Sequence, residues 1–257
     1  MSALHYLENL VLEPDGKEGR WRDTYWSAFQ QMRVPLMLEW GLELTGAWQT
    51  PIGAGHGNEF IVLWSAMDIS AWERLCAEST GVTTHPDLRR WRSVAADYLH
   101  HGTGRLLLES PAHDLTVLGR RASNGGSTAS RPVRDEWLYE LELTAFAPDG
   151  RGGRWREDYW PEFRDRLHPT LTRLGLEVVG AWETAPGCGA LDECAFLYRA
   201  PDFSAWHRFL EAVRGSTRDP VLRQRRGEMW VWREQWLTRL LLPAAGHAAS
   251  LLHRELE

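Results

Sequence analysis

Apolar and polar residues alternate along two stretches of the chain, residues 4–12 and residues 138–146. Alternation of this kind places every second side chain on the same face, so both stretches are predicted as β-strands. Each is followed by the tripeptide Pro-Asp-Gly, at 14–16 and at 148–150, which favours a turn. The two regions therefore begin in the same way.

A helical pattern comes after each predicted strand. In the later region, apolar side chains recur every four residues and form one stripe, at Trp155, Tyr159, Phe163, Leu167 and Leu171. In the earlier region the same stripe begins with Trp21, Tyr25 and Phe29. Gly41 and Gly175 then occupy the position at which a left-handed residue commonly ends a helix.

The remaining elements complete one compact pattern. Two strands are predicted over 42–50 and 60–66, a second helix after Asp68, a further helical stretch near Pro86 and a last strand over 105–108. The order β-α-β-β-α-β is that of a ferredoxin-like unit. Its helices cover one face of the sheet, so the other face needs a partner.

The whole pattern occurs twice in the chain. Residues 19–26, Gly-Arg-Trp-Arg-Asp-Thr-Tyr-Trp, recur as residues 153–160, so the offset is 155 − 21 = 134. At this single offset about forty of roughly 105 aligned positions are identical. We therefore predict an α+β fold of two tandem ferredoxin-like domains, whose sheets pack face to face as an intramolecular α/β barrel of the dimeric type.

The repeat also sets the expected domain boundaries. Domain 1 is predicted over residues 1–110 and domain 2 over residues 135–245, with a C-terminal tail over 246–257. Between the domains, residues 111–134 include a Gly/Ser-rich run that buries too little apolar surface to order itself. This segment is predicted as a flexible linker.

Charge and composition narrow the class of partner. The net charge of −6 argues against nucleic acid or an anionic membrane as the main partner. No apolar run approaches the length of a membrane span, and the first residues lack the basic and apolar regions of a signal peptide. The three cysteines are expected to be reduced thiols in a cytosol. The basic residues are nearly all arginine, which indicates a bacterial genome rich in G and C.

Three short motifs recur at matching places in the two halves: Tyr6-Leu-Glu-Asn and Tyr139-Glu-Leu-Glu, Thr-Gly-Ala-Trp48 and Val-Gly-Ala-Trp182, and Leu-Trp64 and Leu-Tyr198. With these motifs the chain resembles the NIPSNAP family, within the wider dimeric α/β-barrel superfamily. The resemblance implies the ferredoxin-like fold. Relatives in the superfamily include cofactor-independent monooxygenases, polyketide cyclases, lactone isomerases and some haem enzymes, whereas some NIPSNAP proteins are interaction adaptors.

Positions that differ between the copies are free to carry function. The copies differ at His5, His56 and His85, which align with Tyr139, Ala190 and Asp219. His5 shares a strand face with Leu7, and this face is expected to meet the helices. Imidazole suits proton transfer because its pKa lies near neutral pH. The alternative is that these are unrelated surface or loop histidines.

The resemblance to the cyclases of the superfamily implies a cavity between sheet and helices. On that basis the candidate catalytic residues are His5, Tyr25, His56 and His85. The candidate substrate-binding residues are Trp21, Trp48, Trp64, Glu8, Glu59, Glu142, Tyr139 and Tyr159. The tryptophans recur between copies, so core packing is their alternative role. The recurring glutamates either face each other inside the barrel as paired carboxylates or pair with arginines at strand edges.

The predicted function is proton-transfer chemistry, as cyclisation or isomerisation, or cofactor-free oxygenation of an aromatic or polyketide-like ligand in a biosynthetic pathway. No metal and no organic cofactor are predicted. The alternative is a non-catalytic small-molecule-binding or adaptor protein. A third option, haem binding, comes from superfamily analogy, although His100 and His101 would point about 100° apart on a helix. The protein is expected to act as a monomer with a pseudo-dimeric barrel or as a homodimer.

Overall fold

The computed structural model describes residues 4–13, 21–51, 58–66, 68–80, 85–123, 137–146, 155–190, 192–214, 219–224 and 233–254. These residues form two compact units. Unit 1 holds the described residues up to 107 together with 242–254, and unit 2 holds 108–123 and the described residues of 137–241. Within these ranges no helix is long and apolar enough to cross a membrane.

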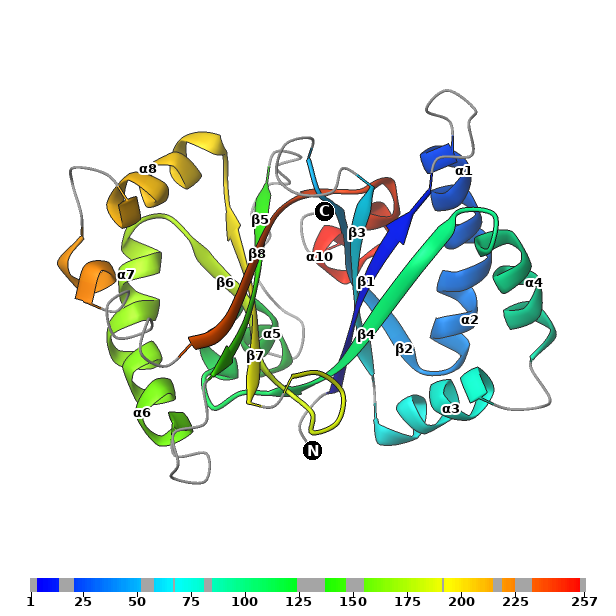
Figure 1. The fold of residues 1–257 in the computed structure, drawn as a ribbon, viewed down its shortest axis with the longest axis horizontal. Helices are drawn as coiled ribbons and strands as arrows, with labels where there is room; N and C mark the ends of the chain where they lie inside the picture. The colour runs from blue at the N-terminus through cyan, green and yellow to red at the C-terminus, as the bar shows by residue number, and fades with distance from the viewer. Residues whose placement is uncertain are drawn as a thin grey trace. The chain divides into compact units, whose positions relative to one another are not determined.

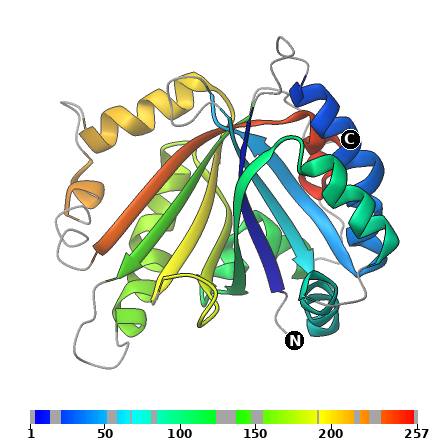
Figure 2. The same ribbon diagram turned by 45° about the vertical axis from the view of Figure 1, so that its right-hand side comes forward.

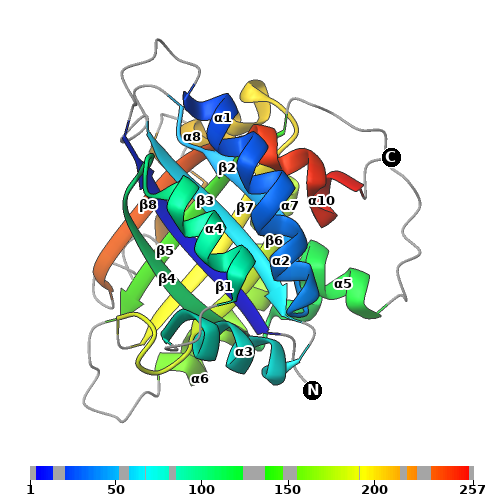
Figure 3. The same cartoon turned by 90° about the vertical axis from the view of Figure 1, so that its right-hand side faces the viewer.

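Unit 1 is a sheet with helices on one face (Figures 1 and 3). Its strand β3 pairs antiparallel with both β1 and β2. In chain order its elements are β1 (Leu4–Leu12), α1 (Trp21–Ala28), a π-helical turn (Phe29–Arg33), α2 (Val34–Glu39), β2 (Leu42–Gln49), β3 (Glu59–Ala66), α3 (Ile69–Thr80), α4 (Pro86–Ala95) and β4 (Leu99–Glu109).

Unit 2 repeats this order, with a short helical stretch over 220–224 in the place of α4, and Figure 2 shows three of its strands, β8, β5 and β7, side by side. Its elements are β5 (Leu138–Phe146), α6 (Trp155–Glu162), a π-helical turn (Phe163–Leu167), α7 (His168–Arg173), β6 (Glu177–Thr184), β7 (Glu193–Ala200), α8 (Phe203–Arg214) and β8 (Arg233–Pro243). The α+β architecture of two ferredoxin-like copies is confirmed.

The eight strands belong to one closed antiparallel barrel with the hydrogen-bonded order β1-β3-β2-β8-β5-β7-β6-β4. Strand β8 contributes to both units. Its residues 233–241 pair with β5, whereas Leu242 and Pro243 pair with Gln49 and Trp48 of β2. The barrel predicted from the repeat is therefore present.

The two faces of each sheet are distinguished by their packing. Along β1, the even-numbered residues pack into a core with the helices, and we call this the helix side of the sheet. The odd-numbered residues, among them His5 and Leu7, lie on the opposite side. In unit 2 the even-numbered strand residues Phe146, Phe196 and Tyr198 likewise lie on the helix side.

The helix stripe predicted from the sequence is confirmed in unit 2 and, from Tyr25 onward, in unit 1, with one structural addition. Steps of four residues advance the stripe by about 40° per turn around an ordinary α-helix. A wider π-helical turn compensates for this drift, at 29–33 in unit 1 and at 163–167 in unit 2. Gly41 and Gly175 end the helices at φ values of 85° and 87°, as predicted.

The segment after the last strand of each sequence copy belongs to the unit built on the other copy. After β4, a 3-10 turn (His113–Leu115) and α5 (Val117–Ser123) belong to unit 2, where Ser110 N donates to the Ala181 carbonyl at 3.3 Å. After β8, a 3-10 turn (Ala245–Ala249) and α10 (Leu251–Arg254) belong to unit 1, where Ala244 N donates to the Ala47 carbonyl at 3.0 Å. We call these the exchanged segments.

Part of the stretch expected to be linker, residues 113–123, is thus helical, and residues 124–136 lie outside the described ranges. The exchanged segments obey the same offset of 134, since His113 aligns with His247 and Leu118 with Leu252. His113 and His247 are therefore a histidine pair that recurs between the copies. In unit 1 the segment packs closely on α1, because a Cβ on Gly246 would lie 2.5 Å from the Trp26 ring.

Candidate active site

The helix side of unit 1 contains a buried ion pair. Arg33, the last residue of the π-helical turn, occupies the fourth position of the apolar stripe. Its Nη2 donates to Oε1 of Glu8 on β1 at 2.5 Å, and both side chains are largely buried. A cation thus occupies a core position that holds leucine in the other copy, and the carboxylate neutralises it.

Aromatic rings enclose this pair. The indole nitrogen of Trp64 donates to the second Glu8 oxygen at 2.8 Å, so each carboxylate oxygen has a donor. The Arg33 guanidinium carbon lies 5.9 Å from the Trp64 ring centre and 5.7 Å from that of Trp91. Burial disfavours the charged form, but the Glu8 charge prevails and holds the pKa of Arg33 above its ordinary value.

Two tyrosines complete the cluster, which we call the Arg33 cluster: Glu8, Arg33, Trp64, Trp91, Tyr6 and Tyr25. Burial raises the pKa of Tyr25 well above its ordinary value, although Arg33 opposes the shift. Burial and then the Glu8 charge raise the pKa of Tyr6 in the same direction. Both phenols are therefore neutral donors at any ordinary pH. Arg33 Nε is buried and has no hydrogen-bond partner in the described part of the chain.

The same positions of unit 2 hold no such pair. Arg33 aligns with Leu167, Trp64 with Tyr198 and Val62 with Phe196. Rings fill the space, with Phe196 stacked 5.3 Å from Phe163 and 5.9 Å from Tyr198. Glu142, the counterpart of Glu8, accepts a hydrogen bond from the Thr144 hydroxyl at 2.9 Å. Predicted site residue Tyr159 is buried in this aromatic core.

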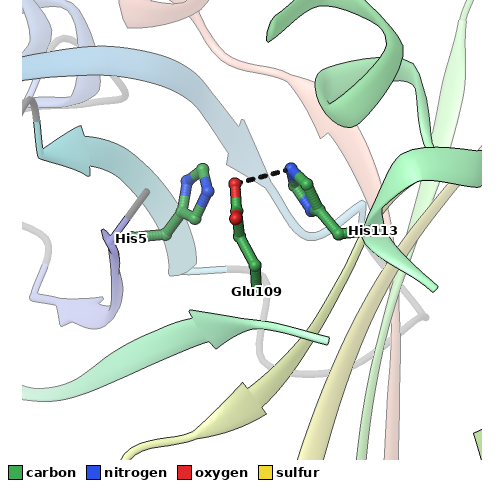
Figure 4. A group of neighbouring side chains, drawn as sticks. All are labelled: His5, Glu109 and His113. Carbon is green, nitrogen blue, oxygen red and sulfur yellow. Dashed lines mark ion pairs between the residues drawn. The ribbon is translucent and has the colours of Figure 1, made fainter. Parts of the chain in front are cut away.

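The structure separates His5 from Tyr25, which sequence reasoning had placed in one cavity. His5 is buried on the opposite side of the sheet, where its Nδ1 lies 3.0 Å from the Ser65 hydroxyl (residue labelled in Figure 4). That hydroxyl lies 2.6 Å from Thr45 Oγ1. The expectation that Leu7 and His5 face the helices is wrong, because Leu10 and Leu12 do so and strand residues alternate.

The other predicted catalytic histidines do not join the Arg33 cluster in the part of the chain that is described. His56 lies outside the described ranges. His85 precedes α4 and caps it, since its Nδ1 accepts from Asp87 N at 3.3 Å. Its ring stands edge-on to Trp40, with 6.0 Å between ring centres. This arrangement gives His85 a structural role.

Of the predicted substrate-binding residues, Glu8 and Trp64 lie in the Arg33 cluster, as does the predicted catalytic Tyr25. Trp21 begins α1, but its side chain lies outside what the structure describes. Trp48 is buried on the opposite side of the sheet, with its ring centre 5.4 Å from that of His247 in the exchanged segment. Tyr139 is likewise buried on the opposite side of β5.

The recurring glutamates have separate partners. Glu59 accepts from the Asn9 side chain at 2.8 Å, and Glu193 accepts from the Thr184 hydroxyl at 2.9 Å. The pairing of Glu8 with Arg33 matches one of the two expected arrangements, but that pair lies in the core rather than at a strand edge. His100 and His101 lie on β4, not on a helix, and His100 Nδ1 contacts exposed Glu13 at 2.8 Å.

Sequence reasoning missed Arg33, Glu109 and His113. Arg33 was detectable as a cation at a stripe position. In unit 2, His113 Nε2 lies 3.1 Å from Glu109 Oε1 (dashed line in Figure 4), and burial lowers the pKa of His113 although Glu109 opposes this. His5 in unit 1 carries an imidazole nitrogen of the type that binds metal ions. In unit 2, Glu109 offers a carboxylate oxygen and His113 an imidazole nitrogen of the same type.

The fold places this chain in a class, the ferredoxin-like α/β barrels. No family model and no curated protein sequence matches the chain. Solved structures of this class do match over nearly their whole length.

An anthrone oxidase-like protein is 12% identical with a TM-score of 0.61, over 98% of this chain and 97% of that one. A candidate monooxygenase from Lactobacillus acidophilus is 10% identical with a TM-score of 0.53, over 94% and 93%. A mutant chlorite dismutase from Candidatus Nitrospira defluvii is 8% identical with a TM-score of 0.53, over 99% and 95%. At these identities the likeness shows the fold.

Proposed function

We propose that unit 1 is the catalytic half of a small-molecule enzyme that oxygenates an enolisable aromatic compound with O2 and without an organic cofactor. One observation carries the proposal. The fourth stripe position holds a buried, ion-paired arginine in unit 1 and a leucine in unit 2, although both units have the same fold. The likeness in fold to an anthrone oxidase-like protein and to a candidate monooxygenase supports the substrate class.

The chemistry needs a group that stabilises an oxyanion. An anthrone has an acidic CH2 group, and its ketone oxygen takes up negative charge when the proton leaves. Arg33 supplies fixed positive charge for that oxygen, and Tyr25 supplies a neutral phenol that donates a second hydrogen bond. Glu8 is engaged by Arg33 and Trp64, so its role is to position the guanidinium. The Trp64 and Trp91 rings provide flat apolar walls.

The reaction is balanced without another reactant. The substrate releases a proton to water, and the enolate passes electrons to O2 and forms a C–O bond. Protonation gives a hydroperoxide, which loses water to leave a new C=O group. The net change is CH2 + O2 → C=O + H2O. His5 and His85 take no part, because one lies on the opposite side of the sheet and the other caps α4.

The test is oxygen uptake by the purified protein with an anthrone, with the quinone product identified by mass. Arg33→Leu, which installs the residue of the second copy, is expected to lower turnover by about 10²–10³-fold, the usual loss for one oxyanion donor. Saturable ligand binding without oxygen uptake would instead identify a non-catalytic small-molecule-binding protein.

A NIPSNAP-type relationship and a bacterial cytosolic setting belong to the proposal as well, and they rest on the recurring motifs and the arginine-rich composition.

A further inference from the structure

Unit 2 has a second buried cation, on the side of its sheet opposite the helices. Arg199 lies on β7 and pairs across the ladder with Tyr139 of β5. Its guanidinium carbon is 4.4 Å from the ring centre of Trp137, the residue that precedes β5. Arg199 is 7% exposed and Trp137 is 6% exposed, so the stacked pair is buried.

Arg199 and Trp137 have more hydrogen-bond donors than acceptors to receive them. Arg199 Nε and Nη2 both donate to a single oxygen of Glu177, Oε2, at 2.9 and 2.8 Å. Arg199 Nη1 is buried and has no hydrogen-bond partner among the described residues, and the same holds for the indole nitrogen of Trp137. A buried donor without an acceptor is costly, and more so when the donor is charged. Two such donors lie on two residues in contact.

Among the described residues, no other indole shows this combination. Trp155 also buries its indole nitrogen without a described partner and has Arg156 stacked on it at 5.0 Å. Arg156, however, is 43% exposed and has Glu183 and Asp192 as partners. In the first copy Arg199 aligns with Ser65, which bonds to Thr45. The donor pair is therefore a feature of the second copy.

We propose that Arg199 and Trp137 form the donor half of a binding site for a compact carboxylate. A guanidinium edge and an indole N–H both donate and neither accepts, so the ligand must offer acceptor atoms only. Two carboxylate oxygens match two adjacent donors. Glu177 already neutralises the single positive charge of Arg199. A bound monoanion therefore leaves one net negative charge at the site, whereas a phosphate dianion would leave two, so the monoanion is favoured. This site is separate from the Arg33 cluster and does not depend on its function.

The experiment is an acetate titration of full-length protein carrying 15N in its indole groups, observed by NMR. Trp137→Phe identifies the Trp137 signal by its loss. Acetate is expected to shift this signal saturably, whereas sodium chloride at the same ionic strength leaves it in place. A signal that acetate does not move overturns the proposal, and an equal shift by chloride means an adventitious ion only and overturns it too.

Two variants sharpen the test. Arg199→Ser, which installs the residue of the first copy, is expected to weaken acetate binding about tenfold or more. The matched control Arg156→Ser removes a stacked arginine that is partly exposed and paired with two carboxylates, and it is expected to leave the affinity unchanged. Equal affinity in Arg199→Ser contradicts the proposal. Should that variant not fold, Trp137→Phe decides the matter, because acetate should raise the melting temperature of the wild type and not that of Trp137→Phe.

Discussion

The helix sides of the two units are built on the same stripe and differ at its fourth position. In unit 1 the stripe carries Arg33, paired with Glu8 beneath Trp64. In unit 2 the corresponding stripe carries Leu167, and Phe196 and Tyr198 fill the space. Since the second copy folds in the same way with leucine, the fold does not require the ion pair. A buried pair is often no more stabilising than apolar packing, so its presence in unit 1 points to function.

The largest expected effect comes from breaking the pair on one side only. Arg33→Leu leaves Glu8 buried without its cation, and we expect a loss of about 3–5 kcal/mol in the free energy of unfolding. Adding Glu8→Leu should return most of that loss, because both charges are then gone. Urea unfolding of the two variants measures this, and a double variant as unstable as the single one would contradict the comparison.

The pH dependence of the free energy of unfolding tests the packing of the exchanged segment in unit 1. Burial lowers the pKa of His247 from 6.5 to about 4, so below pH 6.5 protons bind the unfolded chain more readily than the folded one. Stability from this group is complete above about pH 6.5 and is lost as the pH falls toward 4, by about 3 kcal/mol in all. His247→Asn should flatten this limb of the stability curve, and exposed His100→Asn should not.

A third variant, with arginine in the second copy, tests whether the core of unit 2 can accommodate a buried arginine–glutamate pair. Leu167→Arg brings a longer, charged side chain near Glu142 into a core already filled by rings. Overpacking is expected to cost about 1–3 kcal/mol in the free energy of unfolding, with Glu142 limiting the electrostatic part. Thermal unfolding of this variant and of Leu167→Met as size control gives the difference. An unchanged stability would mean that the two interiors are more alike than their packing indicates.

The smallest expected effect on stability is that of Tyr25→Phe. The ring, which carries the packing against Trp26 and Phe29, is retained, so we expect a change within about 1 kcal/mol. Ligand affinity should fall about tenfold if the phenol donates to the bound oxyanion. Isothermal titration with an anthrone measures it, and the matched variant Tyr159→Phe in unit 2 should leave the affinity unchanged.

The sequence predicted the fold because the repeat, the alternation in β1 and the helix stripe are local patterns. The face of His5 was assigned wrongly because both sides of β1 are buried, so alternation alone does not show which side meets the helices. Arg33 could have been found as a cation within an apolar stripe. His113 and His247 could have been found by following the offset past the last strand. The contact of Trp137 with Arg199 depends on strand register, which a single sequence does not fix.

The role of the Arg33 cluster is tested most directly by the oxygen uptake of the Glu8→Leu/Arg33→Leu double variant with an anthrone. This variant gives unit 1 an apolar stripe like that of unit 2 and is expected to keep its fold, as checked by circular dichroism and unfolding. We expect a folded protein whose turnover is lower by at least about 10²-fold. A folded double variant with wild-type turnover would show that the Arg33 cluster is not the site of the reaction.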